Sequence, residues 1–560
     1  MTAVEAPRVS PPRERISGGA PAPPGRYAQA ASRRTDALLS AGLATAILAG
    51  VAIRCWLVLS RDFPLNDGGL FYAMADDLRH NGYALPVTTT YNGAALPFAY
   101  SPLALYGAAV MADLGVPLAD ALRFLPLLAT CLLLGAFVLL ARELLATRAE
   151  LVAATFAFAL VPRSSTWLLM GGGLTRSFGF LFALLAAWQA TRFYKHGRWR
   201  HLVAATVLSA LTVLSHLGTA PSLVIAMVLL FLVYGRSWRA FLGMVVIALG
   251  TALLSAPWWG TVLAHHGLET FRAANATGES LFSDYDGRHR VLMSLANFGA
   301  TKTGEPMAPI VWLFALIGGM AALVRGSWML PAWWVLLLMF DGRQGGTFAT
   351  VPMSMLAGIG VVGVVLPALM AVGPDPRRRR VARLIAALLL ATLVVYTGAW
   401  GLSRDQDYGG EGWTLEALTP AQRQAMTWLR DATPPHSRVL VVSGTWWPMD
   451  RTSEWLPVLA GRPSVATVQG YEWVPGGVFN ARLHQYEVVQ TCGGQGVRCL
   501  ERWIANTGST VDYVFIPRIK PQPCCKKLLQ ELAASPGWTR VFGNTGAIIF
   551  QRRPRPATAG

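Results

Sequence analysis

The feature that most constrains this chain is a series of long apolar blocks between residues 37 and 401. Most blocks are about 20 residues long, and a helix of that length spans the hydrocarbon core of a bilayer, which is about 30 Å thick. Hydrophobic residues make up 53% of the chain and charged residues only 14%, about half the charged fraction of soluble domains. The sequence therefore predicts a polytopic α-helical membrane protein and excludes a soluble enzyme.

The basic residues are gathered in short clusters between these blocks, although the formal net charge is +18. Nucleic-acid-binding proteins instead present one basic face, so we expect anionic lipid headgroups as partners and no nucleic acid. Alternate loops carry the excess of Lys and Arg that is typical of cytoplasmic loops. These loops are residues 142–148, 192–201, 235–239, 324–327 and 374–383.

We expect about eleven transmembrane helices. Residues 1–36 contain no apolar run, so they predict a disordered basic arm on the cytoplasmic side and no cleavable signal peptide. An odd number of spans then places residues 402–560 outside the cytoplasm. The expected spans are residues 37–60, 119–141, 149–162, 174–193, 201–217, 220–234, 240–263, 307–324, 328–341, 348–372 and 383–401.

The last part of the chain, residues 402–560, predicts an extracytoplasmic α/β domain. Thr419 and Gln422 form a capping box, with Pro420 at the first helical position, that opens a helix through Arg430. Apolar runs predict strands, and stretches between them predict covering helices. We expect strands at 438–444, 511–517 and 547–551, and helices at 499–507 and 526–534.

Four cysteines lie in this domain, which suits an oxidising compartment. Cys492 and Cys499 bracket a glycine-rich stretch that we interpret as a loop, and they are our choice for a disulfide. Four cysteines allow three pairings, and a metal site stays open as an alternative.

Two of the expected outer loops are long, residues 61–118 and 264–306. Within the first, residues 101–116 are apolar but too short to span the membrane comfortably. We expect them to lie along the interface as a re-entrant or amphipathic helix.

The first outer loop also holds the best candidate for chemistry, Asp67. Its carboxylate could act as a general base, coordinate Mg²⁺ or Mn²⁺, or simply cap the following helix. The glycines after it leave the backbone open to close approach by a ligand. Asp76 and Asp77 follow on the same helical stretch, where we expect a solvated face.

Several cationic residues could bind a phosphate on the same side of the membrane. Arg163, Arg176 and Arg343 fall at the outer ends of spans, where a guanidinium can hold a phosphate bidentately or extend to lipid headgroups. Arg54 lies inside the first span, where a charge is costly and indicates function. His216 and His266 are further candidates, although no spacing supports a zinc site.

The first part of the chain resembles the start of GT-C superfamily glycosyltransferases. These include protein mannosyltransferases, the aminoarabinose transferase of lipid A and the catalytic subunit of oligosaccharyltransferase. The resemblance rests on Asp67 followed by Tyr72, on Tyr100-Ser101-Pro102-Leu103, and on Arg123-Phe124-Leu125-Pro126 at the start of the second span. In that superfamily an acidic residue follows the first span, a Tyr-Pro-Pro-Leu element ends the loop, and Arg-Leu-Pro opens the second span. The motifs cover residues 37–145, and the rest of the chain matches only in architecture.

The resemblance implies an enzyme that transfers a hexosyl or pentosyl group from a polyprenyl-phosphate-linked donor outside the cytoplasm. Asp67 would be the base or the group that orients the acceptor. Arginines would bind the lipid phosphate, and Tyr72 and Tyr100 would line the substrate site. The acceptor could be a glycan, a lipid or a protein. High Ala, Arg and Gly usage fits a bacterial protein of high genomic GC content, which would act in the cell envelope.

A second stretch, Trp446-Trp447-Pro448-Met449-Asp450, is similar to the Trp-Trp-Asp element of oligosaccharyltransferases, which reads the acceptor peptide. Here the aspartate is displaced by two residues, so we expect a packed tryptophan pair and do not carry over peptide recognition. Residues 164–173 contain no acidic residue, whereas oligosaccharyltransferases place a metal-binding acidic pair in that loop.

Two other classes of function stay open. A transporter of lipid-linked sugars is expected to show inverted repeats and broken helices, and neither is visible in the sequence. A non-catalytic scaffold or receptor would leave Asp67 dispensable. If the chain is an enzyme, Asp67, Arg343 and one further arginine should converge on a single cavity at the outer membrane face.

Overall fold

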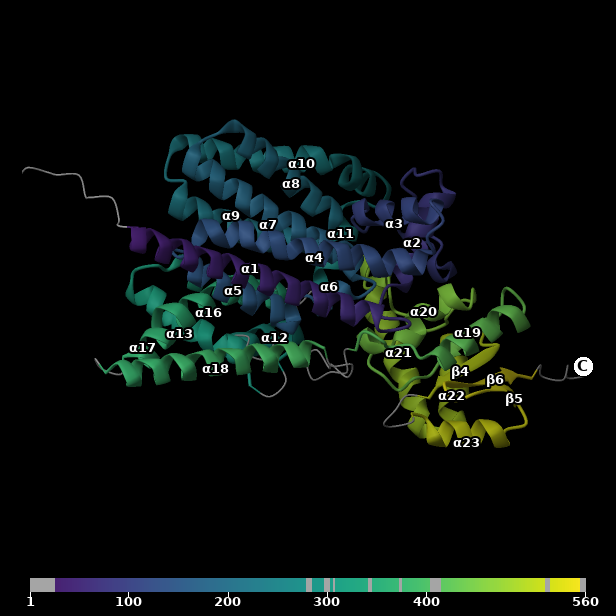
Figure 1. The fold of residues 1–560 in the computed structure, drawn as a ribbon. Helices are drawn as coiled ribbons and strands as arrows, with labels where there is room; N and C mark the ends of the chain where they lie inside the picture. The colour runs from purple at the N-terminus through teal and green to yellow at the C-terminus, as the bar shows by residue number, and fades with distance from the viewer. Residues whose placement is uncertain are drawn as a thin grey trace, which may run out of the picture.

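The computed structural model describes residues 26–277, 285–296, 303–305, 308–340, 345–371, 375–402, 414–518 and 524–553. These residues form a bundle of long helices and a C-terminal domain that packs against one end of the bundle (Figure 1). The first helix begins at Arg26, so residues 26–36, which we assigned to a disordered arm, are helical. Residues 1–25 lie outside the described part.

Every span predicted from the sequence overlaps a helix in the part of the chain that the structure describes. Within the described residues, six helices are long and apolar enough to cross a bilayer, and a pair bent by 84° at residue 161 raises the number to seven. The count of eleven crossings therefore stays a prediction. The bundle helices are α1 (Arg26–Leu59), α4 (Leu118–Leu144), α5 (Arg148–Leu160), α7 (Gly173–His196), α8 (Trp199–Ser215), α9 (Ala220–Tyr234), α10 (Trp238–His266), α13 (Ile310–Val324), α14 (Met329–Phe340), α16 (Thr350–Gly360), α17 (Leu366–Met370) and α18 (Pro376–Gly401).

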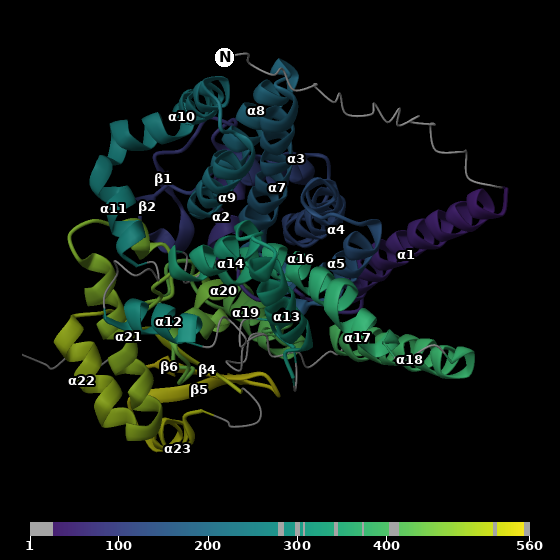
Figure 2. The same ribbon diagram turned by 90° about the vertical axis from the view of Figure 1, so that its left-hand side faces the viewer.

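Small residues let neighbouring helices approach closely, as is usual in membrane bundles. A Cβ atom at Gly318 of α13 would overlap the backbone of Leu356 on α16, and one at Gly360 would overlap the backbone of Phe314. Helix α7 lies in the middle of the bundle, while α10 and α18 lie at its periphery (Figure 2). The peripheral helices bury least, with 22% and 17% of their most apolar stretches buried.

The basic loops gather at the end of the bundle that is remote from the C-terminal domain. Arg148 pairs with Asp36 at 3.1 Å, Lys195 pairs with Glu143 at 3.2 Å, and Arg239 donates to the carbonyl of Gly197. These contacts join loops that are far apart in the sequence but expected on one side of the membrane.

The segment between α1 and α4 lies beside the C-terminal domain (Figure 1). It contains α2 (Gly69–His80), a small sheet of β1 (Thr88–Thr89) and β2 (Leu96–Pro97), and α3 (Leu103–Asp113). Helix α3 corresponds to the predicted interfacial helix, and its 11 residues are too few to span a bilayer.

The predicted solvated face of α2 is wrong for Asp77, which is 8% exposed. Its carboxylate accepts hydrogen bonds from the hydroxyls of Thr89 and Thr90 and from the Thr90 N–H. Asp77 therefore fixes the turn after β1. Asp76 is more exposed and pairs with Arg79 at 3.0 Å.

The C-terminal domain is a four-stranded sheet with helices on both faces. Its strand order is β3 (Val439–Val441), β4 (Tyr513–Pro517), β6 (Ala547–Arg552) and β5 (Trp538–Gly543), with β3 parallel to β4 and the other pairs antiparallel. Helices α19 (Pro420–Ala432) and α20 (Arg451–Leu459) pack on one face. Helices α21 (Val478–Gln495), α22 (Val497–Thr507) and α23 (Lys526–Ala534) pack on the other face.

The capping box predicted at Thr419 and Gln422 is present. The three predicted strands and both predicted helices are also present. The edge strand β5 was not predicted, because polar residues alternate in it and a bulge interrupts its pairing between Arg540 and Phe542.

The four cysteines of this domain lie in two bonded pairs, Cys492 with Cys499 and Cys524 with Cys525. The glycine-rich stretch between the first two is not a loop, because α21 continues to Gln495 and α22 begins at Val497. The bond between Cys492 and Cys499 therefore closes a corner between two helices.

Candidate active site

One cavity of about 780 Å³ lies where the bundle meets the C-terminal domain. Its lining comes from both parts of the molecule. The bundle contributes residues of α2, α7 and α9 and the turn η3 (Leu217–Thr219), and helix α11 (Leu268–Ala276) also takes part. The C-terminal domain contributes α20 and the short helices η6 (Trp447–Met449) and η7 (Tyr471–Trp473).

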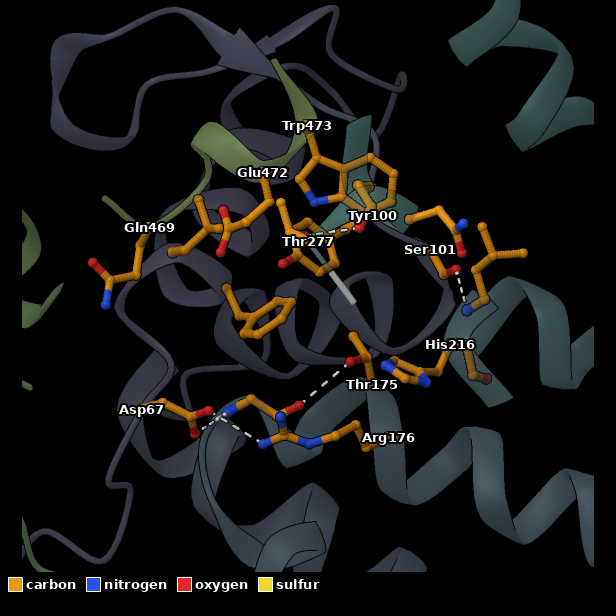
Figure 3. Close-up of a pocket in the computed structure, with 18 of the residues that line it drawn as sticks. Asp67, Tyr100, Ser101, Thr175, Arg176, His216, Thr277, Gln469, Glu472 and Trp473 are labelled. Carbon is orange, nitrogen blue, oxygen red and sulfur yellow. Dashed lines mark hydrogen bonds and ion pairs between the residues drawn. The ribbon is translucent and has the colours of Figure 1, made fainter. Parts of the chain in front are cut away.

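Asp67 lies on the floor of this cavity beside Arg176 (Figure 3). Asp67 Oδ1 accepts from the Gly172 N–H at 2.9 Å, and Asp67 Oδ2 lies 3.2 Å from Arg176 Nη2. Burial opposes ionisation of this carboxyl, but the charges of Arg176 and Arg451 and the Gly172 N–H outweigh it and lower the pKa of Asp67. The carboxylate is therefore ionised at neutral pH and held between a backbone donor and a guanidinium.

Trp167 supports the cationic side of this pair. The guanidinium carbons of Arg163 and Arg176 each lie 4.7 Å from the centroid of the Trp167 ring system. Such cation–π contacts hold a guanidinium in place without neutralising it. Arg176 and Trp167 both line the cavity.

A second ion pair, which sequence analysis did not identify, comes from the C-terminal domain. Arg451 Nη1 lies 2.9 Å from Glu454 Oε2 on α20, and the two side chains are 7% and 5% exposed. Burial raises the pKa of Glu454 to about 7, against the opposing charge of Arg451, and the charge of Asp67 adds to the rise. Asp67, Arg176, Arg451 and Glu454 form what we call the four-charge cluster, and all four residues line the cavity.

The backbone at Asp67 is enclosed by protein on two sides. From the bundle, the Gly171 N–H donates to Leu65 O at 2.6 Å, and a Cβ at Gly171 would overlap the carbonyl of Asp67. From the C-terminal domain, the backbone of Glu454 lies against Gly69, where a Cβ would be 2.5 Å from its carbonyl oxygen. The prediction that Gly68 and Gly69 leave the backbone open to a ligand is therefore wrong, because neighbouring backbone fills that space.

His216 and Tyr100, two of the residues expected to bind substrate, line the cavity. His216 Nδ1 lies 3.0 Å from Thr219 Oγ1, which orients the imidazole. The Tyr100 ring packs edge-on against Phe71 at 4.9 Å and is tilted against Trp473 at 4.8 Å.

The wall opposite Asp67 belongs to the C-terminal domain and carries Gln469, Glu472 and Trp473 (Figure 3). Glu472 Oε2 accepts from the Gly470 N–H at 2.6 Å, which fixes the turn that presents it. Trp447 also lines the cavity, whereas Trp446 is 41% exposed, so the prediction of a packed tryptophan pair is wrong for Trp446. The Trp-Trp element thus pointed to the right region, but the nearby Arg451 and Glu454 carried no signal of their own.

Other predicted residues do not line the cavity. Arg54 is fully buried in the bundle and donates to the carbonyls of Gly50 and Ala159 and to Ser164 Oγ. Tyr72 packs edge-on against Trp455, with ring centroids 6.5 Å apart, and His266 Nε2 lies 2.7 Å from Val87 O. Arg163 lies over the Trp167 ring. Arg343 lies outside the described residues, so its expected convergence with Asp67 stays a prediction. Asp67 and Arg176 do lie together at the cavity, with Arg451 as a further cation.

The residues around Asp67 fit a divalent cation poorly. Each of the two carboxylates in the four-charge cluster already faces an arginine. Among the described residues, no group of three or more His, Cys, Asp or Glu side chains is placed to hold a metal ion. Two carboxylates that are each paired with an arginine do not provide the octahedral set of oxygen ligands that Mg²⁺ prefers.

The chain matches no family model and no curated sequence. Its structure is similar to three solved structures, at 15–17% sequence identity and a TM-score of 0.51 in each case. The oligosaccharyltransferase of Archaeoglobus fulgidus in its apo form aligns over 86% of this chain and 69% of its own. ArnT from Cupriavidus metallidurans in its apo state aligns over 92% and 98%, and arabinofuranosyltransferase AftD from mycobacteria over 91% and 41%. All three are GT-C superfamily glycosyltransferases, so the chain has the fold that its sequence motifs predicted.

Proposed function

We propose that this protein is a membrane glycosyltransferase that moves a sugar from a polyprenyl-phosphate-linked donor to an acceptor on the extracytoplasmic side. The observation that carries the proposal is the Asp67–Arg176 pair on the floor of a cavity that the bundle and the C-terminal domain build together. A solvated Asp67 without cationic neighbours would have argued for a scaffold. The names of the similar structures, an oligosaccharyltransferase and an arabinofuranosyltransferase, point to sugar transfer as well.

The cavity has an apolar side that suits the lipid part of such a donor. Pro221, Val224 and Ile225 of α9 line it, and Val224 is also 58% exposed on the outer surface of the bundle. An apolar chain could therefore lie along α9 in the bilayer while its phosphate reaches the polar floor.

The chemistry requires stabilisation of one leaving group and orientation of one nucleophile. The acceptor hydroxyl attacks the anomeric carbon, and the bond from that carbon to the phosphate oxygen breaks. Arg176, with His216 beside it, stabilises the charge that grows on the departing lipid phosphate. Asp67 accepts the hydrogen bond of the acceptor hydroxyl and takes its proton as the new bond forms.

The proposal puts the cavity outside the cytoplasm. The basic loops lie at the opposite end of the bundle, where the positive-inside rule expects the cytoplasm. The transferred group is a hexose or pentose, and the acceptor is a glycan, lipid or protein. Wall residues Gln469, Glu472 and Trp473 are the candidates for selecting it.

The test uses the purified full-length protein in liposomes with a panel of radiolabelled undecaprenyl-phosphate sugars and a membrane extract as acceptor source. We expect label transfer from one donor, and a loss of about 10²-fold or more in Asp67→Asn, which keeps the shape of the side chain but loses its charge. Asp113→Asn is the matched control, because Asp113 is an exposed aspartate that also pairs with an arginine. Undiminished transfer by Asp67→Asn would remove the catalytic assignment, and donor flipping without transfer would favour a transporter.

A further inference from the structure

The C-terminal domain holds the backbone on both sides of Asp67. Trp455 Nε1 donates to Asn66 O at 2.8 Å, and the Asn66 N–H donates to Leu415 O at 2.8 Å. On the other side, the Gly68 N–H donates to Glu454 Oε1 at 2.8 Å. The position of the Asp67 carboxylate is therefore set by a part of the chain almost 400 residues away in sequence.

This segment needs such support because its backbone is irregular. Asn66 has φ 53° and Gly68 has φ 127°, and neither belongs to a regular helix or strand. Glycine adopts a positive φ readily, but the left-handed conformation of Asn66 costs free energy and persists only where its surroundings hold it. A small loss of support would let Asp67 turn away from the floor of the cavity.

The carboxylate of Glu454 is itself fixed, so it can act as an anchor. Arg451 holds its second oxygen at 2.9 Å, and Tyr91 OH donates to the main-chain carbonyl of Glu454 at 2.7 Å. The next residue, Trp455, is fully buried and packs edge-on against Phe63 with ring centroids 5.0 Å apart. The first turn of α20 is thus held from three directions.

We propose that Glu454 is a positioning residue of the reaction centre, whose carboxylate holds the Gly68 N–H and so keeps the Asp67 carboxylate aimed into the cavity. The inference rests on the proposed function only for the catalytic role of Asp67. It makes the C-terminal domain a working part of the site in addition to a wall for the acceptor.

Two other roles for Glu454 must give different results. It lines the cavity and its pKa is raised to about 7, so it could accept a proton itself. It could also serve only to join the two parts of the molecule. Glutamine separates positioning from proton transfer, because its side-chain carbonyl can still accept from the Gly68 N–H but cannot take up a proton at neutral pH. A role in joining alone would leave backbone exchange around Asp67 and kcat unchanged in a folded Glu454→Ala variant.

The first experiment measures amide hydrogen exchange of peptides covering residues 62–72 in the full-length protein in nanodiscs. We expect exchange in this segment to rise about tenfold in Glu454→Ala and to stay near wild type in Glu454→Gln. Glu501→Gln is the matched control, since Glu501 pairs with Arg552 in the same domain but away from the cavity. Unchanged exchange in Glu454→Ala overturns the proposal, whether or not a donor has been found.

The second experiment measures steady-state transfer with the donor identified above. We expect kcat to fall about 10- to 100-fold in Glu454→Ala with KM for the donor within about twofold, because a misplacement of about 1 Å costs up to about 10²-fold. Glu454→Gln should recover activity to within about fivefold of wild type, and Glu501→Gln should match wild type. Equal losses in the alanine and glutamine variants would show that charge or proton transfer matters, and the positioning role would fall.

Removing Glu454 alone takes a buried ion-pair partner from Arg451, which could unfold the domain. A second pair of variants avoids this problem. Arg451→Met/Glu454→Met and Arg451→Met/Glu454→Gln both lack the ion pair and differ in whether Gly68 keeps its acceptor. We expect the glutamine version to be at least tenfold faster, and equal rates in the two would overturn the proposal.

Discussion

A single methyl group at Gly69 should test how closely the site depends on the contact between its two parts. Gly69 opens α2, and its Cα faces the backbone of α20. In Gly69→Ala the new Cβ would lie 2.5 Å from Glu454 O and 3.1 Å from Glu454 C. Both are main-chain atoms, so neither can rotate out of the way.

The size of the effect follows from that distance. Ordinary contact begins at 3.4 Å, so α2 and α20 must separate by about 0.9 Å at this point. A displacement of about 1 Å at a reacting group can lower the rate by about 10²-fold, which corresponds to about 2.7 kcal/mol of activation free energy. Helix propensity favours Ala over Gly by about 1 kcal/mol in a helix interior, but this term changes the stability of the fold and not the rate of transfer. We therefore expect kcat to fall by tenfold to a hundredfold.

The assay is sugar transfer by purified protein in liposomes, with thermal unfolding of the same samples. Gly135→Ala is the control, because Gly135 lies in α4 and a Cβ there meets no atom within 4 Å. It should leave transfer unchanged and should not lower the unfolding temperature. Wild-type kcat in Gly69→Ala, with the fold intact, would refute the argument that close backbone contact positions Asp67.

Two further predictions concern stability. The pKa of Glu454 rises from 4.5 in the unfolded chain to about 7 in the folded protein. Between these pH values the folded state keeps a proton that the unfolded state loses, so the free energy of unfolding should fall as pH rises from about 4.5 to about 7. Across this range, the unfolding temperature of Glu454→Gln should change less with pH than that of wild type. Part of the pH dependence should remain, because the pKa of Glu305 is also about 7. An equal pH dependence in the two proteins would contradict the assignment. The bond between Cys492 and Cys499 closes a loop with a sequence separation of 7, so the double serine variant should lose about 2.5 kcal/mol on the chain-entropy model. Its melting temperature should drop by several degrees, whereas Cys131→Ser, which removes a free thiol in α4, should not change it.

The parts of the fold that local sequence determines were predicted well. Apolar blocks coincide with the bundle helices, and the capping box at Thr419 begins α19 where expected. Asp67 was found because an acidic residue after the first span is part of a known motif. Arg176 was a candidate from its place near the start of α7.

What the sequence could not reveal was pairing between distant segments. Arg451 and Glu454 look like ordinary charged residues at the start of a helix, and only the packing of α20 against residues 66–69 gives them a role. Arg54 misled for the same reason, since its two terminal nitrogens donate to Gly50, Ala159 and Ser164 inside the bundle. Asp77 was misjudged because the hydroxyls that bind it come from Thr89 and Thr90, beyond the helix.

The enclosure of residues 65–69 between Gly171 on one side and Glu454 and Trp455 on the other limits how such a protein can diversify. A C-terminal domain taken from a relative would bring new wall residues for a new acceptor. Such a chimaera would work only if the first turn of the new α20 still packed against residues 65–69. Grafts that keep Glu454 and Trp455 opposite Gly68 should therefore tolerate replacement of the remaining surface of the domain. Grafts joined inside the first turn of α20 should fold with the Asp67 carboxylate displaced.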